Sequence, residues 1–462
     1  MFILVPILLF GWIPFVCLLF AIMPPRRAVV VGYLGAWMFL PVHGYDLPYL
    51  PGYTKVTAAN IAVLLAASLF DSRTLRAVRP AWFDLPLLIY CLVPFAASLS
   101  NDLGAYDGMS NVLKRLVGWG IPYFIGRAYF TNVQAIRNIA YGVVIGGLIY
   151  IPLCLWEIRM SPMLHEQIFG FRQDPWHHAV RYGGFRPNVF MQTGLMVGMW
   201  MATATVMALW LWRRRAVQKL MGIPMPLVTT ALFVTTVLCK STYSVFLGLI
   251  GTIVIFVSGW TRTSLPMLML VLVPPIYMTT RTTGMVPKDP LVHVAELISN
   301  EDRAHSLDYR LTQEVLFTEK ALERPIFGWG GYNRFKPDEE DWRGGVDALW
   351  ITTFGMTGLV GLITLTVAWL LPAILFLIRY PAQTWNHHAV APVAALAVLL
   401  LMTMCDNLLN AMYNPIMTVI AGGLSSIYMK SRHQTPTPQM IAQEHLEVIA
   451  LDQAAPPRQT HS

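Results

Sequence analysis

The sequence predicts an all-α fold, a polytopic membrane bundle of about 12 to 13 transmembrane helices with one large extracytoplasmic loop. Of the 462 residues, 55% are hydrophobic and only 13% are charged, whereas about 25% are charged in an ordinary soluble domain. Many uncharged runs reach the roughly 20 residues that cross a hydrocarbon layer of about 30 Å. Basic residues gather in alternate links between these runs, as in membrane proteins with Lys-rich and Arg-rich cytoplasmic loops. The net charge of +8 therefore indicates sidedness in a membrane, not a nucleic-acid partner.

The predicted helices follow the apolar runs along the chain. The longest runs are residues 1–23, 138–156, 188–212, 221–239, 242–261, 348–378, 389–405 and 407–429. Shorter or polar-bordered runs are residues 28–42, 56–70, 85–101, 116–130 and 263–280. The first run lacks a preceding basic stretch and a cleavage site of small residues, so we expect a retained helix and not a signal peptide.

Basic residues near the helix ends assign a side to each loop. Those that mark the cytoplasmic side are Arg26, Arg27, Arg73, Arg76, Arg79, Arg127, Arg137, Arg213, Arg214, Arg215, Lys219, Arg262, Arg379, Lys430 and Arg432. The loops assigned to the other side are residues 43–55, 102–115, 157–187, 240–241, 281–346 and 406–415.

Four parts follow from this assignment. Residues 1–280 carry transmembrane helices 1–10, residues 281–346 form the large extracytoplasmic loop, and residues 347–429 carry helices 11–13. Residues 430–462 are rich in Pro, Gln, Thr and Ser and bury too little apolar surface to become ordered. We expect them to form a disordered cytoplasmic tail.

The large loop, residues 281–346, holds 12 of the 25 acidic residues and 9 of the 33 Lys and Arg residues. Within it, residues 306–324 predict an amphipathic helix that Ser306 or Asp308 caps and Pro325 ends. Its predicted apolar stripe consists of Leu307, Leu311, Val315 and Leu322. A loop of this length and charge is usually functional or structured.

Two arginines and an acid stand out in this region. Arg310 and Arg324 are 14 residues apart, about four helical turns, so we expect them on nearly the same side of the helix. Glycines at 328, 330 and 331 then turn the chain. Asp347 begins the next span, and Gly358 further along it permits close helix contact.

These motifs, in this order, resemble the bacterial O-antigen ligase and polysaccharide polymerase superfamily over about residues 180–365. The matching features are Arg310, the Glu-Arg-Pro-Ile-Phe-Gly-Trp-Gly segment at 323–330, Asp347 eleven residues before a Gly-Leu-Val-Gly step, the loop at 183–188 and the turn at 239–244. Family ligases have a His followed by Asn at the position of Asp347 and usually an Arg near Tyr243. These departures favour a polymerase or a divergent member.

The resemblance implies a metal-independent, inverting glycosyltransferase of the bacterial inner membrane, active at the periplasmic face and without a cofactor. Its partners would be an undecaprenyl-diphosphate-linked glycan, an acceptor glycan or lipid, and membrane lipids, with no nucleic acid. The reaction needs cations for the departing diphosphate and a base for the attacking hydroxyl. We predict Arg310 and Asp347 as the catalytic residues, with Asp347 as the base. The predicted substrate-binding residues are Arg186, Arg324, Arg303 and Lys240.

Each candidate also has a structural alternative. Arg310 could pair with Glu314 or Asp308 on its own helix, and Asp347 could be an ordinary N-terminal helix cap. The alternatives for the others are contact with lipid headgroups for Arg186, a solvated helix end for Arg324 and snorkelling from a span for Lys240.

Two further alternatives concern the chemistry and the class of protein. His177 and His178 are neighbours in the chain and face different ways, so no metal site is expected. His165, His293 or His305 could replace the family histidine as the base. A transporter or flippase for a lipid-linked glycan is the second functional hypothesis, although the spans hold few ionisable residues apart from Asp406.

Overall fold

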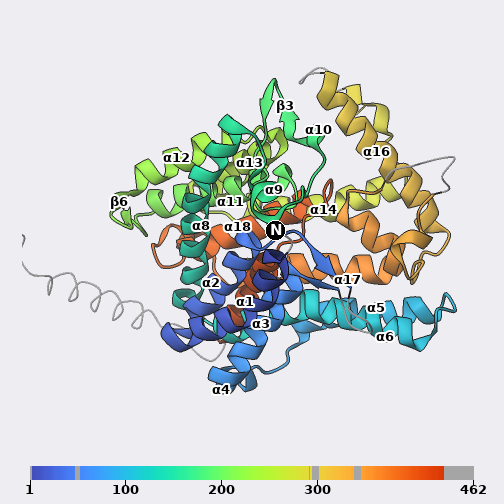
Figure 1. Ribbon diagram of the computed structural model, residues 1–462, viewed down its shortest axis with the longest axis horizontal. Helices are drawn as coiled ribbons and strands as arrows, with labels where there is room; N and C mark the ends of the chain where they lie inside the picture. Colours follow the sequence, from blue (N-terminus) through green and yellow to red (C-terminus); the bar gives the residue numbers. More distant parts are fainter. Residues whose placement is uncertain (1–2, 47–51, 291, 294–300, 338–344, 431–462) are drawn as a thin grey trace, which may run out of the picture.

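The computed structural model describes residues 3–46, 52–290, 292–293, 301–337 and 345–430. It is a bundle of helices joined by short links and three two-stranded hairpins (Figure 1), which confirms the all-α prediction. Of the predicted disordered tail at 430–462, Lys430 is instead the last residue of α19, and residues 431–462 lie outside the described residues.

The helices follow the predicted order. They are α1 (Leu4–Ile22), α2 (Pro25–Phe39), α3 (Lys55–Phe70), α4 (Ser72–Arg76), α5 (Leu85–Leu99), α6 (Gly104–Arg115), α7 (Ile121–Tyr129), α8 (Val133–Met160), α9 (Leu164–Phe169), α10 (Trp176–Ala179), α11 (Gly194–Arg213), α12 (Met225–Leu238), α13 (Thr242–Thr261), α14 (Leu265–Thr282), α16 (Glu301–Leu322), α17 (Leu349–Arg379), α18 (Ala391–Asp406) and α19 (Pro415–Lys430). The hairpins are β1 (Gly44–Tyr45) with β2 (Tyr53–Thr54), β3 (Val180–Arg181) with β4 (Gly184–Phe185), and β5 (Lys219–Leu220) with β6 (Ile223–Pro224).

Every apolar run predicted to span a membrane corresponds to a helix. Among the described residues, six helices are long and apolar enough to cross a bilayer: α1, α5 with its preceding turn, α8, α11, α13 and α17. At the centre lies α18, whose residues are all buried and which packs against α8, α11, α13, α14, α17 and α19. A helix that is apolar on all sides belongs in such a position. The number of crossings stays a prediction.

Most loops assigned to the extracytoplasmic side meet at one end of the bundle, which we call the α16 end. The Val42 amide donates to His165 Nε2 at 3.1 Å, and the Tyr243 hydroxyl donates to the Cys405 carbonyl at 3.0 Å. A second region, where α7 contacts α4 and the last turn of α19, is the α4 end. In Figure 1, α16 lies at the right and α4 at the bottom. Which end faces the cytoplasm stays a prediction.

The loop predicted at 102–115 is instead helical. Residues 104–115 form α6, which runs back along α5 and continues through a π-helical turn at Leu116–Gly120 into α7. The polar residues that suggested a loop have partners here, since Asp107 accepts from Ser98 Oγ at 2.8 Å. The Arg115 guanidinium lies 4.6 Å from the centre of the Tyr90 ring.

The segment after α16 docks into a break in α17. Gly358 has a left-handed φ of +64° inside α17, and a Cβ there would lie 2.2 Å from the Ile326 carbonyl oxygen. The opened turn is filled by backbone hydrogen bonds from Trp329 N to Gly355 O at 2.8 Å and from Leu359 N to Pro325 O at 2.7 Å. Glycine is required because both its φ and this close approach exclude a side chain.

The helix α16 begins at Glu301, so the predicted caps Ser306 and Asp308 are wrong; both lie inside it. The predicted apolar stripe is also wrong in part, because Val315 and Leu322 are 40% and 45% exposed. The face that packs inward consists of Leu311, Gln313, Glu314, Phe317, Thr318 and Ala321. Tertiary partners decide this face: Phe335 packs on Phe317, and Glu314 has a buried ion-pair partner described below.

Candidate functional site

The half-buried Arg310 projects from α16 without the partners expected of a surface arginine. Asp308 binds Lys288 Nζ at 2.9 Å, and Glu314 binds Arg281 Nε at 2.7 Å. Within the described part of the chain, no hydrogen bond or ion pair involves the Arg310 guanidinium. The alternative in which Arg310 pairs along its own helix is therefore wrong.

The Glu314 pair anchors α16 to the bundle. Both Glu314 and Arg281 are almost fully buried, with 3% and 4% of their side chains exposed, and the Tyr277 hydroxyl donates to Glu314 at 2.7 Å. Burial raises the pKa of the Glu314 carboxyl above its ordinary value, although the bonds from Tyr277 and Arg281 oppose this rise. The turn that carries Arg310 is therefore fixed from one helical turn away.

Asp406 lies at the C-terminal end of α18. It is 1% exposed; Oδ1 accepts from Asn410 Nδ2 at 2.8 Å, and Oδ2 has no hydrogen-bond donor among the described residues. Arg310 interacts electrostatically with this carboxylate and with the Tyr243 phenol. We call Arg310, Asp406 and Tyr243 the Arg310 site.

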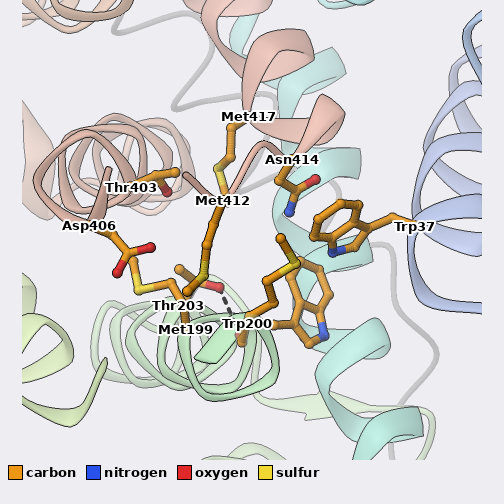
Figure 2. Close-up of a pocket in the computed structure, with 10 residues that line it drawn as sticks. Trp37, Met199, Trp200, Thr203, Thr403, Asp406, Met412, Asn414 and Met417 are labelled. Atoms are coloured by element: carbon orange, nitrogen blue, oxygen red, sulfur yellow. Dashed lines mark hydrogen bonds between the residues drawn. The ribbon is translucent and has the colours of Figure 1, made fainter. Parts of the chain in front are cut away.

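Asp406 also lines a small cavity between α2, α11, α18 and the start of α19. Figure 2 shows Asp406 and Asn414 on two sides of this space, with the Met412 side chain between them. Its volume of ≈ 20 Å³ is about enough for one water molecule. The cavity can satisfy a buried oxygen through water but cannot hold a sugar.

Asp347 is exposed and precedes α17, whose N-cap residue is Ala348 and has no side-chain cap. The helix-cap alternative for Asp347 is therefore wrong. Its segment is held beside α16, because Gln313 Nε2 donates to the Gly345 carbonyl at 2.7 Å. Gln313 is three residues after Arg310, about one helical turn. The structure thus brings the segments of both predicted catalytic residues to the α16 end.

Arg186 and Lys240 pack against each other beneath the 181–188 loop. Arg186 is 4% exposed, and its Nη2 donates to the Lys240 carbonyl at 3.4 Å. Lys240 Nζ donates to the carbonyls of Arg181 at 3.1 Å and Tyr182 at 3.4 Å. A Cβ on Gly184 would lie 2.2 Å from Lys240 Nζ. Lys240 therefore braces the loop and does not snorkel.

Arg324 serves as a clamp between the large loop and α5. Its Nη1 donates to Asn101 Oδ1 at 2.7 Å and to the Ser100 carbonyl at 3.3 Å, and its guanidinium lies 4.7 Å from the centre of the Trp329 ring. It follows the end of α16, so the predicted alignment with Arg310 on one helical face does not apply. The side chain of Arg303 lies outside the described part of the structure.

The histidines differ in how they are held. His165 is 1% exposed; its Nε2 accepts from the Val42 amide, so Nδ1 carries the proton and donates to the Phe171 carbonyl at 3.0 Å. Burial lowers the pKa of His165 to about 4. Both ring nitrogens are used, so His165 is unsuited to act as the base. The described residues contain no cluster of three His, Cys, Asp or Glu residues that could hold a metal.

Two features of this region escaped prediction from the sequence. His178 pairs with Asp174, with Nδ1 and Oδ1 2.8 Å apart; their spacing of four residues was a visible signal. Asp406 was visible as a charge at the end of an apolar run, but its relation to Arg310 is set by α16, about 100 residues away in the chain.

The chain matches no model of a known protein family, and no curated protein resembles it at a significant level.

Proposed function

We propose that this protein is a membrane glycosyltransferase that transfers or polymerises glycan from undecaprenyl diphosphate onto an acceptor hydroxyl at the extracytoplasmic face of the bacterial inner membrane. The observation that carries the proposal is that no described residue forms a hydrogen bond or ion pair with the guanidinium of Arg310. Arginine is suited to diphosphate because its planar fork matches phosphate oxygens and stays charged at any relevant pH.

The surroundings of Arg310 support this role. The two acids nearest in the helix, Asp308 and Glu314, are bound by Lys288 and Arg281, so neither competes with a substrate anion. Asp406 interacts electrostatically with Arg310, and no described bond joins the two, so the donors of Arg310 are left available. A prearranged cation of this kind stabilises the charge that grows on a departing diphosphate.

The reaction also needs a proton acceptor for the attacking hydroxyl. Asp347 is the candidate from the sequence, and its exposed carboxylate is accessible to substrate. No described hydrogen bond orients it.

The second candidate function is a transporter or flippase for a lipid-linked glycan. The observation that favours it is the buried Asp406 beside a cavity in the bundle interior, because ionisable groups inside membrane bundles often mark transport pathways. The cavity of ≈ 20 Å³ would have to open widely for such a cargo.

Complementation of a deletion strain separates these functions. Arg310→Ala should abolish the glycan product at normal protein levels, and Arg310→Lys should leave a small remainder, because a point charge replaces a bidentate fork. Arg334→Ala is the matched control, an exposed arginine in the same loop, and should be silent.

The accumulated material identifies the step. Single repeat units on the lipid carrier indicate a polymerase, and full-length chains left on the carrier indicate a ligase. Lipid-linked glycan trapped at the cytoplasmic face would indicate a flippase. Full product from Arg310→Ala would contradict a role for Arg310 in any of them.

A further inference from the structure

The segment between α9 and α11 holds a histidine that is oriented as a general base. We propose that this segment is the acceptor-sugar site, in which His178, positioned by Asp174, takes the proton of the attacking hydroxyl beside the Trp176 ring. This proposal rests on the proposed glycosyl transfer and assigns its base to His178 in place of Asp347.

The geometry of the His178 pair meets the requirements for a base. His178 Nδ1 lies 2.8 Å from Asp174 Oδ1, and the exposed fractions of the two side chains are 46% and 6%. A buried carboxylate on one ring nitrogen keeps the proton there, so the lone pair is left on Nε2. No described residue bonds Nε2, which leaves it available to a substrate hydroxyl. Among the described residues, none makes a comparable orienting contact with Asp347.

The carboxylate of Asp174 is itself held by the bundle. Asp174 Oδ2 accepts from Asn188 Nδ2 at 3.3 Å, and the Asn188 amide donates to Glu157 Oε2 at 2.8 Å. Glu157 is fully buried at the end of α8 and also accepts from the Val189 amide at 2.7 Å. Two successive hydrogen bonds through Asn188 therefore connect the His178–Asp174 pair to α8. An ordinary surface ion pair has no such connection to the bundle.

Trp176 gives this segment an aromatic platform. Its ring is 44% exposed, lies 4.4 Å from the Arg172 guanidinium and makes an edge contact with Phe185 at 5.7 Å. These contacts fix the ring while leaving part of it open. The negative face of an aromatic ring attracts the weakly positive C–H groups of a sugar. A ring two residues before His178 can thus hold an acceptor sugar near Nε2.

A chain of contacts links this segment to the Arg310 site. The Tyr182 hydroxyl lies 2.9 Å from Thr242 Oγ1, and the next residue, Tyr243, interacts electrostatically with Arg310. In Figure 1, α10 and β3 are drawn at the upper edge of the view, to the left of α16. The loop that follows the proposed acceptor site therefore contacts the N-terminal end of α13, the helix whose Tyr243 interacts electrostatically with Arg310.

In the proposed step, the acceptor oxygen forms a bond to the anomeric carbon of the donor sugar. The bond from that carbon to the diphosphate oxygen breaks, and its electron pair leaves with the diphosphate, which Arg310 holds. The proton of the acceptor hydroxyl passes to His178 Nε2 and later to water. The step needs no redox partner.

The test uses membranes with the full-length protein, a lipid-linked glycan donor and a saccharide acceptor, assayed from pH 5.5 to 9. His178→Gln should lower kcat by about 10² or more, whereas His177→Gln, the matched control one residue away, should leave it unchanged. Asp174→Asn should lower kcat less than His178→Gln does and leave KM for the donor unchanged, and Asp174→Glu should restore part of the loss, because a carboxylate again holds the ring tautomer. A merely structural role would lower the folded yield instead and would not separate kcat from KM.

Trp176 supplies an independent measurement. Trp176→Ala should raise KM for the acceptor at least several-fold and leave KM for the donor unchanged, and Trp176→Phe should restore most of the loss. Unchanged kcat and pH profile in His178→Gln would overturn the proposal. If Arg310→Ala abolishes transfer while His178→Gln does not, only the acceptor site fails; if neither variant matters, the proposed function fails as well.

Discussion

Both ends of the bundle contain a buried aspartate near an arginine, but the two pairs are arranged differently. At the α4 end, Arg127 Nε lies 3.0 Å from Asp84 Oδ1, and each side chain is 1% exposed. At the α16 end, Asp406 is equally buried, yet Arg310 makes no described bond to it. We call the directly bonded Arg127–Asp84 pair the closed pair. We call Arg310 and Asp406, which no described bond joins, the open pair.

The other hydrogen-bond donors to the two aspartates also differ in number. Asp84 also accepts from the Tyr123 hydroxyl at 2.9 Å and the Ala81 amide at 2.8 Å. Asp406 has one described donor, Asn410. Buried polar groups are normally satisfied, and an exception calls for an explanation. The α4 end holds helices together, whereas the α16 end keeps a cation available, as a site for an anionic substrate requires.

The largest expected effect is the difference in stability between Arg127→Ala and Arg310→Ala. Arg127→Ala leaves the Asp84 carboxylate buried without its cation, which should cost about 3–5 kcal/mol of stability and most of the folded protein. Arg310→Ala removes no described bond and should change stability by at most about 0.5 kcal/mol. Folded yield and thermal midpoints in one detergent measure both, and equal losses would contradict the distinction.

His165 also lies at the α16 end, but unlike Arg310 it has hydrogen-bond partners for both of its ring nitrogens. Its pKa of about 4 in the folded state is below the ordinary value of about 6.5, so the unfolded chain binds the proton first. Stability should therefore be highest above about pH 6.5 and fall as the pH drops toward 4, by at most about 3 kcal/mol.

Thermal midpoints of the unmodified protein and of His165→Gln, measured across this pH range, check the prediction. The variant should be less stable at neutral pH but should lose less on acidification. Parallel curves for the two proteins would assign the acid sensitivity to other groups.

Asp406→Asn tests the open pair directly. Asn keeps the size of the side chain and removes its charge, so folding should be retained while transfer falls about tenfold, equivalent to about 1.4 kcal/mol. The reason is that Arg310 loses the negative charge with which it interacts electrostatically. Asp84→Asn is the matched control at the closed pair and should instead reduce folded yield. Normal transfer in Asp406→Asn would separate Asp406 from the Arg310 site.

The smallest expected effect is at Asp347. Its side chain caps no helix, so Asp347→Ala should cost no more than about 0.5 kcal/mol. With His178 as the base, Asp347→Asn should change kcat by less than about twofold. A loss of about 10² in kcat at unchanged expression would return the base role to Asp347.

The helices were predictable because a membrane span needs a long apolar run, and such runs can be read directly from the sequence. The helix at 104–115 was not predictable, because its polar residues find partners on α5 that only the folded bundle supplies. The buried face of α16 was missed for the same reason: Glu314 turns inward to meet Arg281, which lies 33 residues earlier in the chain.

The candidate site was predictable only in part. Charge and motif order singled out Arg310, but they also placed Lys240 and Arg324 among the substrate-binding candidates, and the structure uses both as braces. Spacing alone cannot tell a bonded cation from an available one. That difference depends on carbonyl groups such as those of Arg181 and Ser100, which have no signature in the sequence.

No described residue bonds the Arg310 guanidinium, and in the proposed function this guanidinium binds a diphosphate. The direct measurement is the affinity of the purified full-length protein for undecaprenyl diphosphate, compared among the unmodified chain, Arg310→Ala and the control Arg334→Ala. We expect Arg310→Ala to weaken binding at least tenfold, about 1.4 kcal/mol, and Arg334→Ala to bind normally. Equal affinity in all three proteins would contradict it.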